Sequence, residues 1–473
     1  MLFRLVYDEA LAHASYLIGC QRTRQAIVFD PSRDVDQYRF LASMHGLRIT
    51  ATAETHIHAD FLSGCGELAR QCQAHVYVSG EGGEEWQSRW VKGHDHTVLR
   101  DGDTFQLGGI QFRAIHTPGH TPEHLIYEIT DQPSSDEPLG LITGDFVFVG
   151  ALGRPDLLES ELGVAGAREA SARQLHASAT EFIKFPEYLQ VWPAHGSGSS
   201  CGKALGAVPQ STVGYECRAN PQLAHVDDQD AFIQEILAGQ PAPPLYFARM
   251  KACNRDGVPP MNLDSAPTIL APDDAAALDL DRVTIIDARP WQHYRARHAR
   301  GALWSAPGAW FPASVGSFVE RDQPVVLLID GSVAEQYLRL LYRIGIDQIE
   351  GVMTPEVFEA AADRMETEAA QEIDAHGLQQ QVEAGNTRIV DVRNPDEFER
   401  GCVPNAVHVP YTRLAENLDK LPPPGDEPLL VHCQAGLRSA MAMSFLCRHG
   451  YRPVNIAGGY GAWSQIASRQ IHS

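Results

Sequence analysis

The sequence has no run of 18 consecutive apolar residues, and its N-terminal stretch mixes polar with apolar side chains and shows no continuous apolar core. Both absences argue against membrane insertion and export. Basic residues are also scarce, with 38 Lys and Arg against 60 Asp and Glu and a formal net charge of -22. Such a charge repels phosphate backbones and anionic lipids. We therefore expect a cytoplasmic protein without nucleic-acid or membrane partners.

Cysteine is represented by nine scattered residues, none of which forms a CxxC pair. An odd number of unclustered cysteines favours neither a disulfide framework nor a zinc site built from thiolates. A cysteine that matters for function is therefore expected to be a reactive thiol, and most of the others to be small buried side chains.

The length of 473 residues, 44% of them apolar, predicts two to four domains. Strand-like runs such as AIVFD, ITATAETH, LGLITGD and YLQVWPAH end in polar or glycine-rich loops, and they indicate an α/β fold over residues 1–245. A proline-rich stretch between Gln240 and Asp274 follows this region. It predicts a linker over residues 246–265.

An internal repeat fills the rest of the chain. TIIDARPWQHYRARHARGAL resembles RIVDVRNPDEFERGCVPNAV, so that the Asp-x-Arg at 287–289 matches the one at 391–393. The glycines that end the two matching helical stretches also align. Each copy alternates strands and helices, which predicts two small parallel-sheet α/β domains, over residues 266–365 and 370–473.

Imidazoles and carboxylates gather at the ends of four strand-like runs in the first half. They occur in His56-Ile57-His58-Ala59-Asp60, in Pro118-Gly119-His120-Thr121, in Gly144-Asp145 and in Pro193-Ala194-His195. Loops at one edge of a sheet are neighbours in space, so these side chains can converge on one cation. A single histidine is more often a surface or core residue, but four such clusters predict a metal site.

The motifs HIHAD, PGHT, GD and PAH, in this order, resemble those of the metallo-β-lactamase superfamily over residues 1–245. The resemblance implies an αββα sandwich. Members that bind two metals carry the first motif as HxHxDH, whereas this chain has Phe61 at the last position. Loss of that imidazole is expected to leave one metal firmly bound and to cripple the second site.

Within this superfamily, the first half resembles the persulfide dioxygenases, which hold iron with two histidines and one carboxylate. Carried over by position, the ligands are His56, His120 and Asp145, with one Fe(II) per chain. Such a triad leaves positions free for substrate and dioxygen. A zinc-bound hydroxide, as in hydrolases of the same fold, is the alternative.

Neighbouring side chains receive supporting roles from the same resemblance. His58 and Asp60 are expected to orient a ligand or to accept protons, while a direct fourth ligand at His58 stays open. His195 would be left over from the second site, and His116 lies outside the motif's metal position and is interpreted as structural or supporting. Cys201, shortly after the PAH motif, is either an inert loop cysteine or a thiol that exchanges persulfide with the substrate.

The segment Cys433-Gln434-Ala435-Gly436-Leu437-Arg438-Ser439 lies between an apolar strand and a helical run. At such a junction, backbone N–H groups and the helix N-terminus stabilise a thiolate or a persulfide anion. The segment resembles the active loop of the rhodanese sulfurtransferases, with four residues between cysteine and arginine, one fewer than in phosphatases of this fold. The resemblance implies that Cys433 is catalytic and that Arg438 and Ser439 bind a sulfur oxyanion.

The first copy of the repeat lacks this chemistry. Asp330 stands opposite Cys433, and Glu335 stands opposite Arg438. Two carboxylates repel thiosulfate and sulfite, and no thiol is present there to carry sulfur. We therefore interpret residues 266–365 as a catalytically inactive rhodanese-like domain that packs the other domains together or contributes to a subunit interface.

Together these resemblances imply an enzyme of sulfide detoxification. It would use Fe(II) and O2 to oxidise a low-molecular-weight thiol persulfide, such as glutathione persulfide, to sulfite and free thiol, and would transfer sulfane sulfur through Cys433 to or from thiosulfate. We expect it to be a homo-oligomer. One alternative is a zinc-dependent thioester hydrolase or lactonase with rhodanese modules that bind sulfur. Another is a non-enzymatic scaffold whose tandem modules dock a partner protein.

Overall fold

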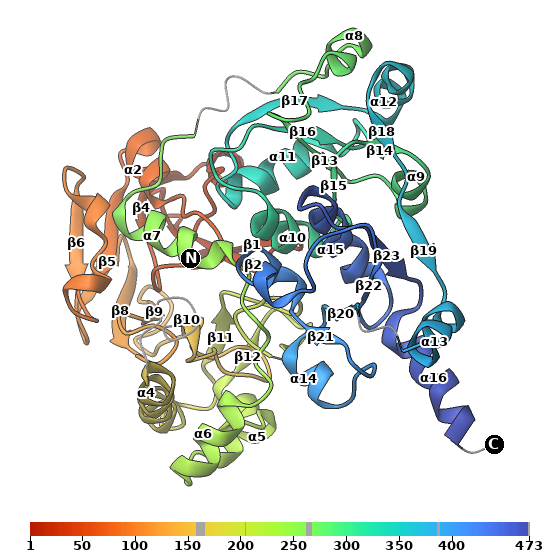
Figure 1. Cartoon of the computed structure of the whole chain (residues 1–473). Helices are drawn as coiled ribbons and strands as arrows, with labels where there is room; N and C mark the ends of the chain where they lie inside the picture. Colours follow the sequence, from red (N-terminus) through yellow and green to blue (C-terminus); the bar gives the residue numbers. More distant parts are fainter. Residues whose placement is uncertain (158–165, 204, 262–266, 386–387, 472–473) are drawn as a thin grey trace. The chain divides into compact units, whose positions relative to one another are not determined.

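The computed structural model describes residues 1–157, 166–203, 205–261, 267–385 and 388–471. The chain forms two compact units, which are taken separately below (Figure 1). Unit 1 comprises Met1–Asn262 with Tyr342–Gly345, and unit 2 comprises Leu263–Leu341 with Ile346–Ser473. No helix in the described part of the chain has the length and apolar character that a membrane crossing requires.

Unit 1 contains two six-stranded sheets. The strands of the first sheet lie side by side in chain order: β1(Leu2–Asp8), β2(His13–Cys20), β3(Gln25–Phe29), β4(Arg48–Ala53), β5(His75–Ser79) and β6(His96–Leu99). The strands of the second sheet follow the reverse order: β12(Ser211–Thr212), β11(Gln190–Pro193), β10(Gly140–Gly144), β9(Leu125–Asp131), β8(Ile110–His116) and β7(Thr104–Leu107).

Helices accompany these sheets at intervals along the chain. The helices of unit 1 are α1(Asp36–Met44), α2(Cys65–Cys72), α4(Ala167–Phe182), α5(Val213–Ala219), α6(Gln229–Leu237) and α7(Tyr246–Asp256), with 3-10 turns η1(Glu84–Trp86), η2(Arg89–Val91) and η3(Leu223–His225). In α4, the apolar residues Ala172, Leu175, Ala179 and Phe182 recur every three or four positions and are all buried. This spacing gives α4 one apolar face, and that face packs against the second sheet.

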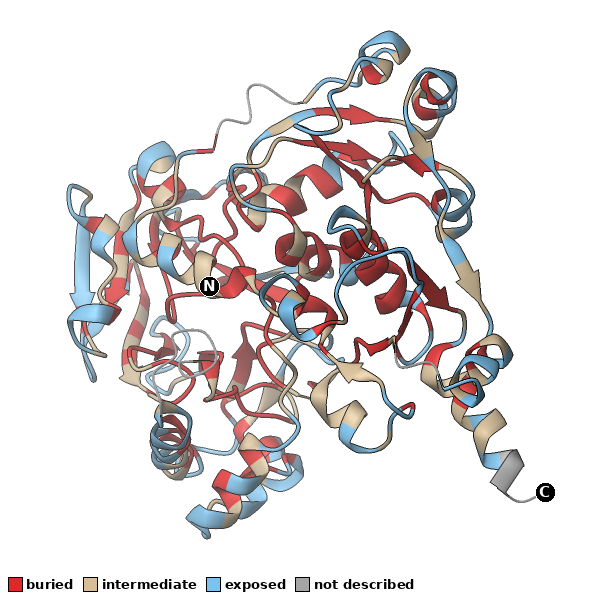
Figure 2. Ribbon diagram, viewed as in Figure 1, coloured by how far each residue is buried: buried red, intermediate tan, exposed pale blue. Residues whose placement is uncertain are grey.

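The two sheets pack face to face and enclose a core to which both contribute. Aromatic rings from the first sheet, such as Phe29, meet rings from the second, such as Phe112 and Tyr127, at centroid distances of 5.4 and 5.0 Å. Side chains of α1 and α2 pack on the outer face of the first sheet, and those of α4 and α6 on the outer face of the second. Figure 2 shows the buried strands between helices that expose their outer sides. The predicted αββα sandwich is confirmed.

Helix α7 lies within the stretch for which we predict a linker. Its residues Tyr246, Phe247 and Met250 are buried, and Asn254 donates hydrogen bonds to the carbonyl oxygens of His58 and Phe61. Residues 246–256 are therefore part of unit 1, because burial of these apolar side chains outweighs the turn-forming composition around them. The end of the predicted linker, from residue 262, lies outside the described residues.

Unit 2 contains two parallel sheets. The first has the order β15(Leu303–Trp304), β13(Thr284–Asp287), β16(Val325–Leu328) and β17(Ile349–Met353). The second has the order β21(Val407–His408), β20(Ile389–Asp391), β22(Leu429–His432), β23(Pro453–Ile456) and β19(Gln371–Ile373). A short antiparallel pair joins β14(His298–Ala299) to β18(Thr367–Glu368).

The two parallel sheets share one topology, which agrees with the sequence repeat. Taken in chain order, the four strands of the first sheet occupy the same places as β20, β21, β22 and β23 in the second. The helices that follow residue 270 are α8(Pro272–Ala276), α9(Trp291–Ala296), α10(Trp310–Phe318), α11(Ala334–Arg343), α12(Pro355–Ala361), α13(Ala375–Glu383), α14(Pro395–Glu399), α15(Leu437–Arg448) and α16(Gly459–Ile471), with 3-10 turns η4(Ala362–Arg364), η5(Tyr411–Glu416) and η6(Leu418–Lys420). We call the two halves of unit 2 the first module (266–365) and the second module (370–473).

Candidate metal centre and cysteine loop

The four histidine and aspartate motifs of unit 1 meet at one edge of the two sheets. His56 follows β4, His120 lies between β8 and β9, Asp145 follows β10, and His195 follows β11. All four side chains are buried, with at most 3% of each residue exposed. The polar residues that follow strands of both sheets therefore lie together in one buried region.

Three of these side chains place donor atoms around a common point. One ligand atom each from His56, His120 and Asp145 lies within 4.8 Å of the other two. Asp145 Oδ2 is 3.3 Å from His120 Nε2 and 3.8 Å from His56 Nε2. Donors that bind one ion at about 2.1 Å are themselves separated by roughly 3.0–3.4 Å, so the cluster needs only a small adjustment to hold a cation.

In both His56 and His120, Nδ1 makes a hydrogen bond and carries the proton, which leaves Nε2 as an acceptor. The Thr55 hydroxyl donates to Asp30 Oδ2 at 3.0 Å, so we assign the proton between Thr55 and His56 to His56 Nδ1. His120 Nδ1 lies 2.9 Å from the carbonyl oxygen of Arg154, which can only accept. Both rings therefore turn the lone pair of Nε2 toward Asp145, as metal ligation requires.

The charge states of these groups suit a cation. Burial, together with the neighbouring His58 and His120, holds the pKa of His56 well below its usual value, so the ring stays neutral. Both carboxylate oxygens of Asp145 are buried and make no hydrogen bond to any described residue. An uncompensated buried carboxylate is costly, and a metal ion removes that cost. The donor set therefore fits a bound divalent metal.

The backbone conformation at Gly144 positions the Asp145 side chain beside His56 and His120. Gly144 has φ of +52°, and a Cβ there would lie 2.6 Å from Thr55 Oγ1. Only glycine avoids both the strain and the contact. The Asp145 N–H donates to His124 Nε2 at 3.0 Å, which holds the residue from its backbone side.

His58 is held away from the three-atom cluster. Its Nε2 lies 3.1 Å from Asp30 Oδ1, and its Nδ1 is buried without a hydrogen-bond partner among the described residues. Burial disfavours the charged ring, yet Asp30, Glu54 and Asp60 together raise the pKa of His58 to about 9. The ring is therefore charged at neutral pH and is not among the three clustered donors, and an orienting role for His58 stays a prediction.

His116 lies apart from the cluster as well. Its Nε2 is 2.8 Å from the carbonyl oxygen of Pro122, so the ring helps to close the loop that carries His120. Phe61, at the position where a further histidine is expected in two-metal relatives, is fully buried. Its ring centroid lies 4.0 Å from that of His13 and 4.5 Å from that of His58.

A second group of donors lies beside the first. Ligand atoms of Asp60, His195 and Cys201 are all within 4.8 Å of one another, and all three residues are buried. Burial raises the pKa of the Cys201 thiol well above its usual value, and the charges of Asp145 and Asp60 add to this effect. Cys201 is therefore a buried, protonated thiol near the cluster, which agrees with the inert interpretation, and exchange of persulfide with the substrate stays a prediction.

Three supporting residues lie outside the sequence motifs. Asp30 binds both His58 and the Thr55 backbone N–H, the latter at 2.7 Å. His13 lies in β2, with its ring 5.6 Å from that of His195. His124 is the most readily found of the three, because it follows His120 within the same loop and precedes a strand.

A cavity of about 460 Å3 reaches the edge of the metal region in unit 1. Its wall includes His195, the exposed apolar side chains Leu5 and Val208, and Tyr7. His195 thus belongs both to the buried donors and to the wall of a cavity whose size suits an organic group.

The cysteine loop of unit 2 follows β22 and precedes α15. The N–H of Gly436 donates to Cys433 Sγ at 3.1 Å, and the hydroxyl of Ser439 lies 3.6 Å from the same sulfur while it donates to Asn455 Oδ1 at 2.7 Å. Gly436 has φ of +101°, which lets its N–H turn inward. The loop thus places a backbone donor against the sulfur, as its position before a helix predicts.

Arg438 is engaged elsewhere in this state of the protein. Its guanidinium makes a bidentate ion pair with Glu397, at 2.6 and 2.7 Å. Sequence reasoning did not identify Glu397, nor Tyr411, whose buried phenol is close enough for Cys433 and Arg438 to influence its pKa. The role of Arg438 in anion binding stays a prediction.

The DxR motifs of both modules build the same structure. Arg393 Nη2 lies 2.6 Å from Asp391 Oδ2, and Arg289 Nη2 lies 2.7 Å from Asp287 Oδ2. Each arginine also packs over an aromatic ring, Tyr460 or Phe358, at 4.0 and 4.1 Å from the centroid, respectively. The second module adds a contact of 3.5 Å from Arg393 to the side chain of Gln434, next to Cys433.

The matching loop of the first module is built differently. Asp330 is exposed and accepts hydrogen bonds from the N–H and hydroxyl of Ser332, which lower its pKa. Glu335 is also exposed and pairs with Arg339 at 2.9 Å, so it does not point at Asp330. This segment holds no thiol, and the Asp330 carboxylate accepts hydrogen bonds from the backbone and the side chain of Ser332.

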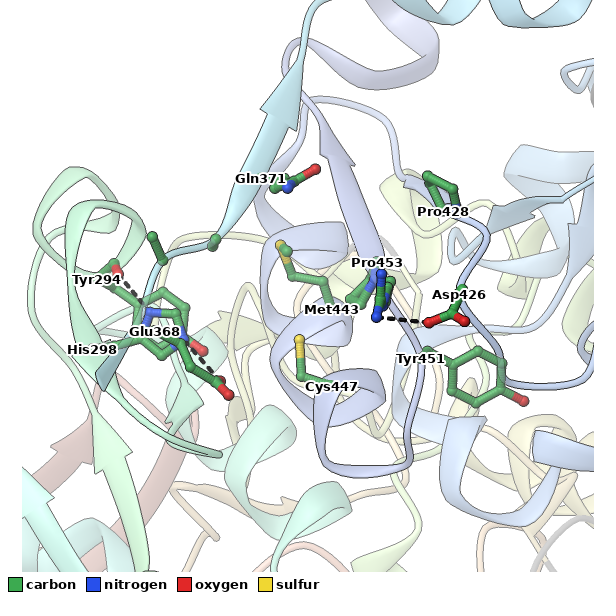
Figure 3. A pocket seen from close by; sticks show the side chains of 13 residues that line it. Tyr294, His298, Glu368, Gln371, Asp426, Pro428, Met443, Cys447, Tyr451 and Pro453 are labelled. Atoms are coloured by element: carbon green, nitrogen blue, oxygen red, sulfur yellow. Dashed lines mark hydrogen bonds and ion pairs between the residues drawn. The ribbon is translucent and has the colours of Figure 1, made fainter. Parts of the chain in front are cut away.

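Cys447 lines a separate cavity of about 550 Å3 within unit 2 (Figure 3). His298 and Glu368 stand on this wall too, with His298 Nε2 and Glu368 Oε2 3.9 Å apart. Burial raises the pKa of the Cys447 thiol to about 12. This cysteine is therefore unreactive at neutral pH.

The fold and these motifs define the class of protein. The sequence profile of the Metallo-beta-lactamase superfamily matches residues 8–195, and that of the Rhodanese-like domain matches residues 374–466. The crystal structure of a metallo-beta-lactamase from Staphylococcus aureus subsp. aureus COL shows 37% sequence identity and a TM-score of 0.67, over 75% of this chain and 99% of that one. The chain belongs to the metallo-β-lactamase superfamily and carries a rhodanese-like domain after the metal-binding fold.

Two relatives of different activity share the metal-binding half. Persulfide dioxygenase ETHE1, mitochondrial, from Homo sapiens is 26% identical over 232 residues, which cover 47% of this chain and 76% of the relative. The probable polyketide biosynthesis zinc-dependent hydrolase BaeB from Bacillus velezensis is 25% identical over 211 residues, which cover 44% of this chain and 84% of the relative. The chain thus combines the superfamily fold with homologues among persulfide dioxygenases and with a rhodanese-like domain.

Proposed function

We propose that the chain is a persulfide dioxygenase fused to a sulfurtransferase. The observation that carries this proposal is the buried cluster of two imidazoles and one carboxylate at His56, His120 and Asp145. This is the donor set of mononuclear non-haem iron oxygenases. A rhodanese-like domain on the same chain and the persulfide dioxygenase relatives support sulfane sulfur as the shared substrate chemistry.

His56, His120 and Asp145 would hold one Fe(II) per chain. When bound, the metal supplies redox chemistry with dioxygen and leaves positions for a substrate sulfur. Burial of the three ligands excludes water from the metal site. Thr55 and the Arg154 carbonyl hold the rings of His56 and His120 in place. The cavity beside His195 would receive the organic part of the thiol.

The reaction balances with one dioxygen and one water for each persulfide. RSSH, O2 and H2O give RSH, sulfite and two protons, and both oxygen atoms of O2 pass to the outer sulfur. The substrate would be glutathione persulfide or a similar small thiol persulfide. A cytoplasmic location and a homo-oligomeric state stay predictions.

Cys433 would carry sulfur between persulfide and thiosulfate. Its thiolate takes the outer sulfur of a second RSSH and releases RS⁻, and the resulting persulfide passes that sulfur to sulfite to form thiosulfate. The Gly436 N–H would stabilise the anionic sulfur in both forms. The step is reversible, so thiosulfate could also supply sulfur to a thiol.

The first module would have a structural role. Its DxR ion pair is intact, but the position of the catalytic cysteine is Asp330. We therefore propose that residues 266–365 form a catalytically inactive rhodanese-like domain that supports the second module.

Metal exchange tests the proposed reaction. The full chain is purified without oxygen, stripped of metal and reloaded with either Fe(II) or Zn2+. Iron-loaded protein should consume oxygen and form sulfite when glutathione persulfide is added, and zinc-loaded protein should not. Iron-loaded protein that consumes no oxygen with any small thiol persulfide would contradict the proposal.

The zinc-dependent hydrolase relative makes thioester or lactone hydrolysis the second candidate. A single zinc site with an open position can generate hydroxide for this reaction. The same two preparations separate the candidates, because a hydrolase is active with zinc and needs no oxygen.

A further inference from the structure

A row of buried hydrogen bonds leads away from the cysteine loop of unit 2. Ser439 lies in the first turn of α15, 3.6 Å from Cys433 Sγ, and its hydroxyl donates to Asn455 Oδ1 at 2.7 Å. At the other end of the same amide, Asn455 Nδ2 donates to Glu372 Oε2 at 2.9 Å. Ser439 and Asn455 are at most 1% exposed. We call Glu372, Asn455 and Ser439 the relay.

The second sheet of unit 2 places Glu372 beside Asn455. The two residues are register partners on the neighbouring parallel strands β19 and β23. Side chains of partner residues on adjacent strands project from the same face of a sheet. The side chain of Glu372 is 14% exposed, so water has little access to this part of the relay.

Helix α9 of the first module holds the Glu372 carboxylate. Trp291 Nε1 donates to Oε2 at 2.8 Å, and Arg295 Nη1 forms an ion pair with Oε1. Trp291 and Arg295 are four residues apart, so they lie on the same face of the helix. The module without a catalytic cysteine thus supplies two donors to the carboxylate at the far end of the relay.

The carboxylate fixes the direction of each hydrogen bond in the relay. Because it can only accept, the NH2 group of Asn455 faces Glu372, and the amide oxygen faces Ser439. Ser439 has a single hydroxyl hydrogen, which goes to the amide oxygen at 2.7 Å in preference to the sulfur at 3.6 Å. Ser439 therefore turns its lone pairs toward Cys433, where they can accept from a thiol but cannot stabilise a thiolate.

We propose that Glu372 is a positioning residue for Cys433, which acts through Asn455 and Ser439 and keeps the Ser439 hydroxyl hydrogen away from the sulfur. The two donors from α9 share this role, because they hold the carboxylate in place. The first module thereby helps to set the reactivity of a cysteine that it does not contain. The inference rests on the proposed function of Cys433 in sulfur transfer only for its biological meaning.

Glu372→Gln reverses the direction of the relay. A glutamine side chain has one oxygen, and the charged Arg295 makes the stronger hydrogen bond to it, so the new NH2 group faces Asn455. The Asn455 amide then turns over and donates to Ser439, whose hydrogen becomes free to stabilise the Cys433 thiolate. We expect iodoacetamide to alkylate Cys433 roughly two- to fivefold faster at neutral pH, as measured by mass spectrometry on the full chain.

A double replacement separates this effect from a general disturbance of the loop. In a chain that already carries Ser439→Ala, Glu372→Gln should leave the alkylation rate of Cys433 unchanged, because the path to the sulfur runs through the missing hydroxyl. The matched control is Glu368→Gln, which makes the same change at a carboxylate that lies 3.9 Å from His298 and outside the relay. This control should leave the rate unchanged.

Asn455→Leu provides a second variant in case Glu372→Gln does not fold. It removes the acceptor of the Ser439 hydrogen and should accelerate alkylation of Cys433 to a similar extent. An unchanged or slower rate in either folded variant, or an acceleration that persists with Ser439→Ala, would overturn the proposal. Alkylation needs neither a sulfur substrate nor a metal, so failure of this inference and failure of the proposed sulfurtransferase can be told apart.

Discussion

The repeated DxR ion pair provides a matched test of the two modules. Asp391→Asn keeps the shape of the side chain but removes the charge that Arg393 meets at 2.6 and 2.9 Å. Asp287→Asn makes the same change opposite Arg289, where the distances are 2.7 and 3.0 Å. All four side chains are at most 2% exposed.

The expected loss of stability is large and equal in the two variants. Removing one partner of a buried ion pair costs about 3–5 kcal/mol, because the remaining charge is left uncompensated. Unit 2 has about 200 residues. At roughly 2–4 °C per kcal/mol for a domain of this size, the unfolding midpoint of unit 2 should fall by about 6–20 °C in each variant.

The expected effect on sulfur transfer differs between the variants. Arg393 contacts Gln434 beside Cys433, so Asp391→Asn should lower the rate of thiosulfate-dependent sulfur transfer. Asp287→Asn should leave that rate unchanged below its unfolding temperature, because the first module has no cysteine at Asp330. Thermal unfolding and a sulfurtransferase assay measure both quantities. Equal losses of transfer in the two variants would refute the assignment of catalysis to the second module alone.

Three further predictions concern the cysteines and the metal. Cys433→Ser should abolish sulfur transfer while oxygen uptake with persulfide continues; a parallel loss of oxygen uptake would contradict separate sites. Chelation should lower the unfolding midpoint of unit 1, because metal at 100 times its Kd stabilises the folded state by about 2.7 kcal/mol; an unchanged midpoint in calorimetry would speak against a metal in the buried cluster. Cys447, with its pKa raised to about 12, has about one part in 10,000 as thiolate at pH 8, so iodoacetamide should label the exposed Cys402 first and label Cys447 faster as pH rises. Mass spectrometry that finds equal labelling at pH 8 would contradict this ordering.

The sandwich fold and the first cluster could be anticipated because their determinants are local. Apolar strands end within three residues of His56, Asp145 and His195, and the polar ends of strands from both sheets lie at the same edge. The strand-loop-helix around Cys433 is local for the same reason. The spacing thus predicts an α/β fold and a metal site, whereas the αββα sandwich and the choice of His56, His120 and Asp145 follow from the resemblance to the metallo-β-lactamase superfamily.

The parts of the structure that the sequence did not predict depend on contacts between residues far apart in the chain. Cys201 joins Asp60 only because the loop after β11 folds back over the sheet edge, and proximity to His195 in the sequence does not specify this. Glu397 captures Arg438 from α14, and no motif links the two. Helix α7 lies in a proline-rich stretch, where composition predicts a linker but burial of Tyr246 and Phe247 decides the outcome.

The stoichiometry of oxygen use tests the central claim most directly. With iron-loaded protein and limiting glutathione persulfide, an oxygen electrode should record one O2 consumed for each persulfide, with sulfite as the product when Cys433 is replaced by serine. Asp145→Asn, which removes the carboxylate of the cluster, should consume none. Oxygen uptake that is undiminished in Asp145→Asn, or iron-loaded protein that uses no oxygen while its zinc-loaded form hydrolyses a thioester, would contradict the account.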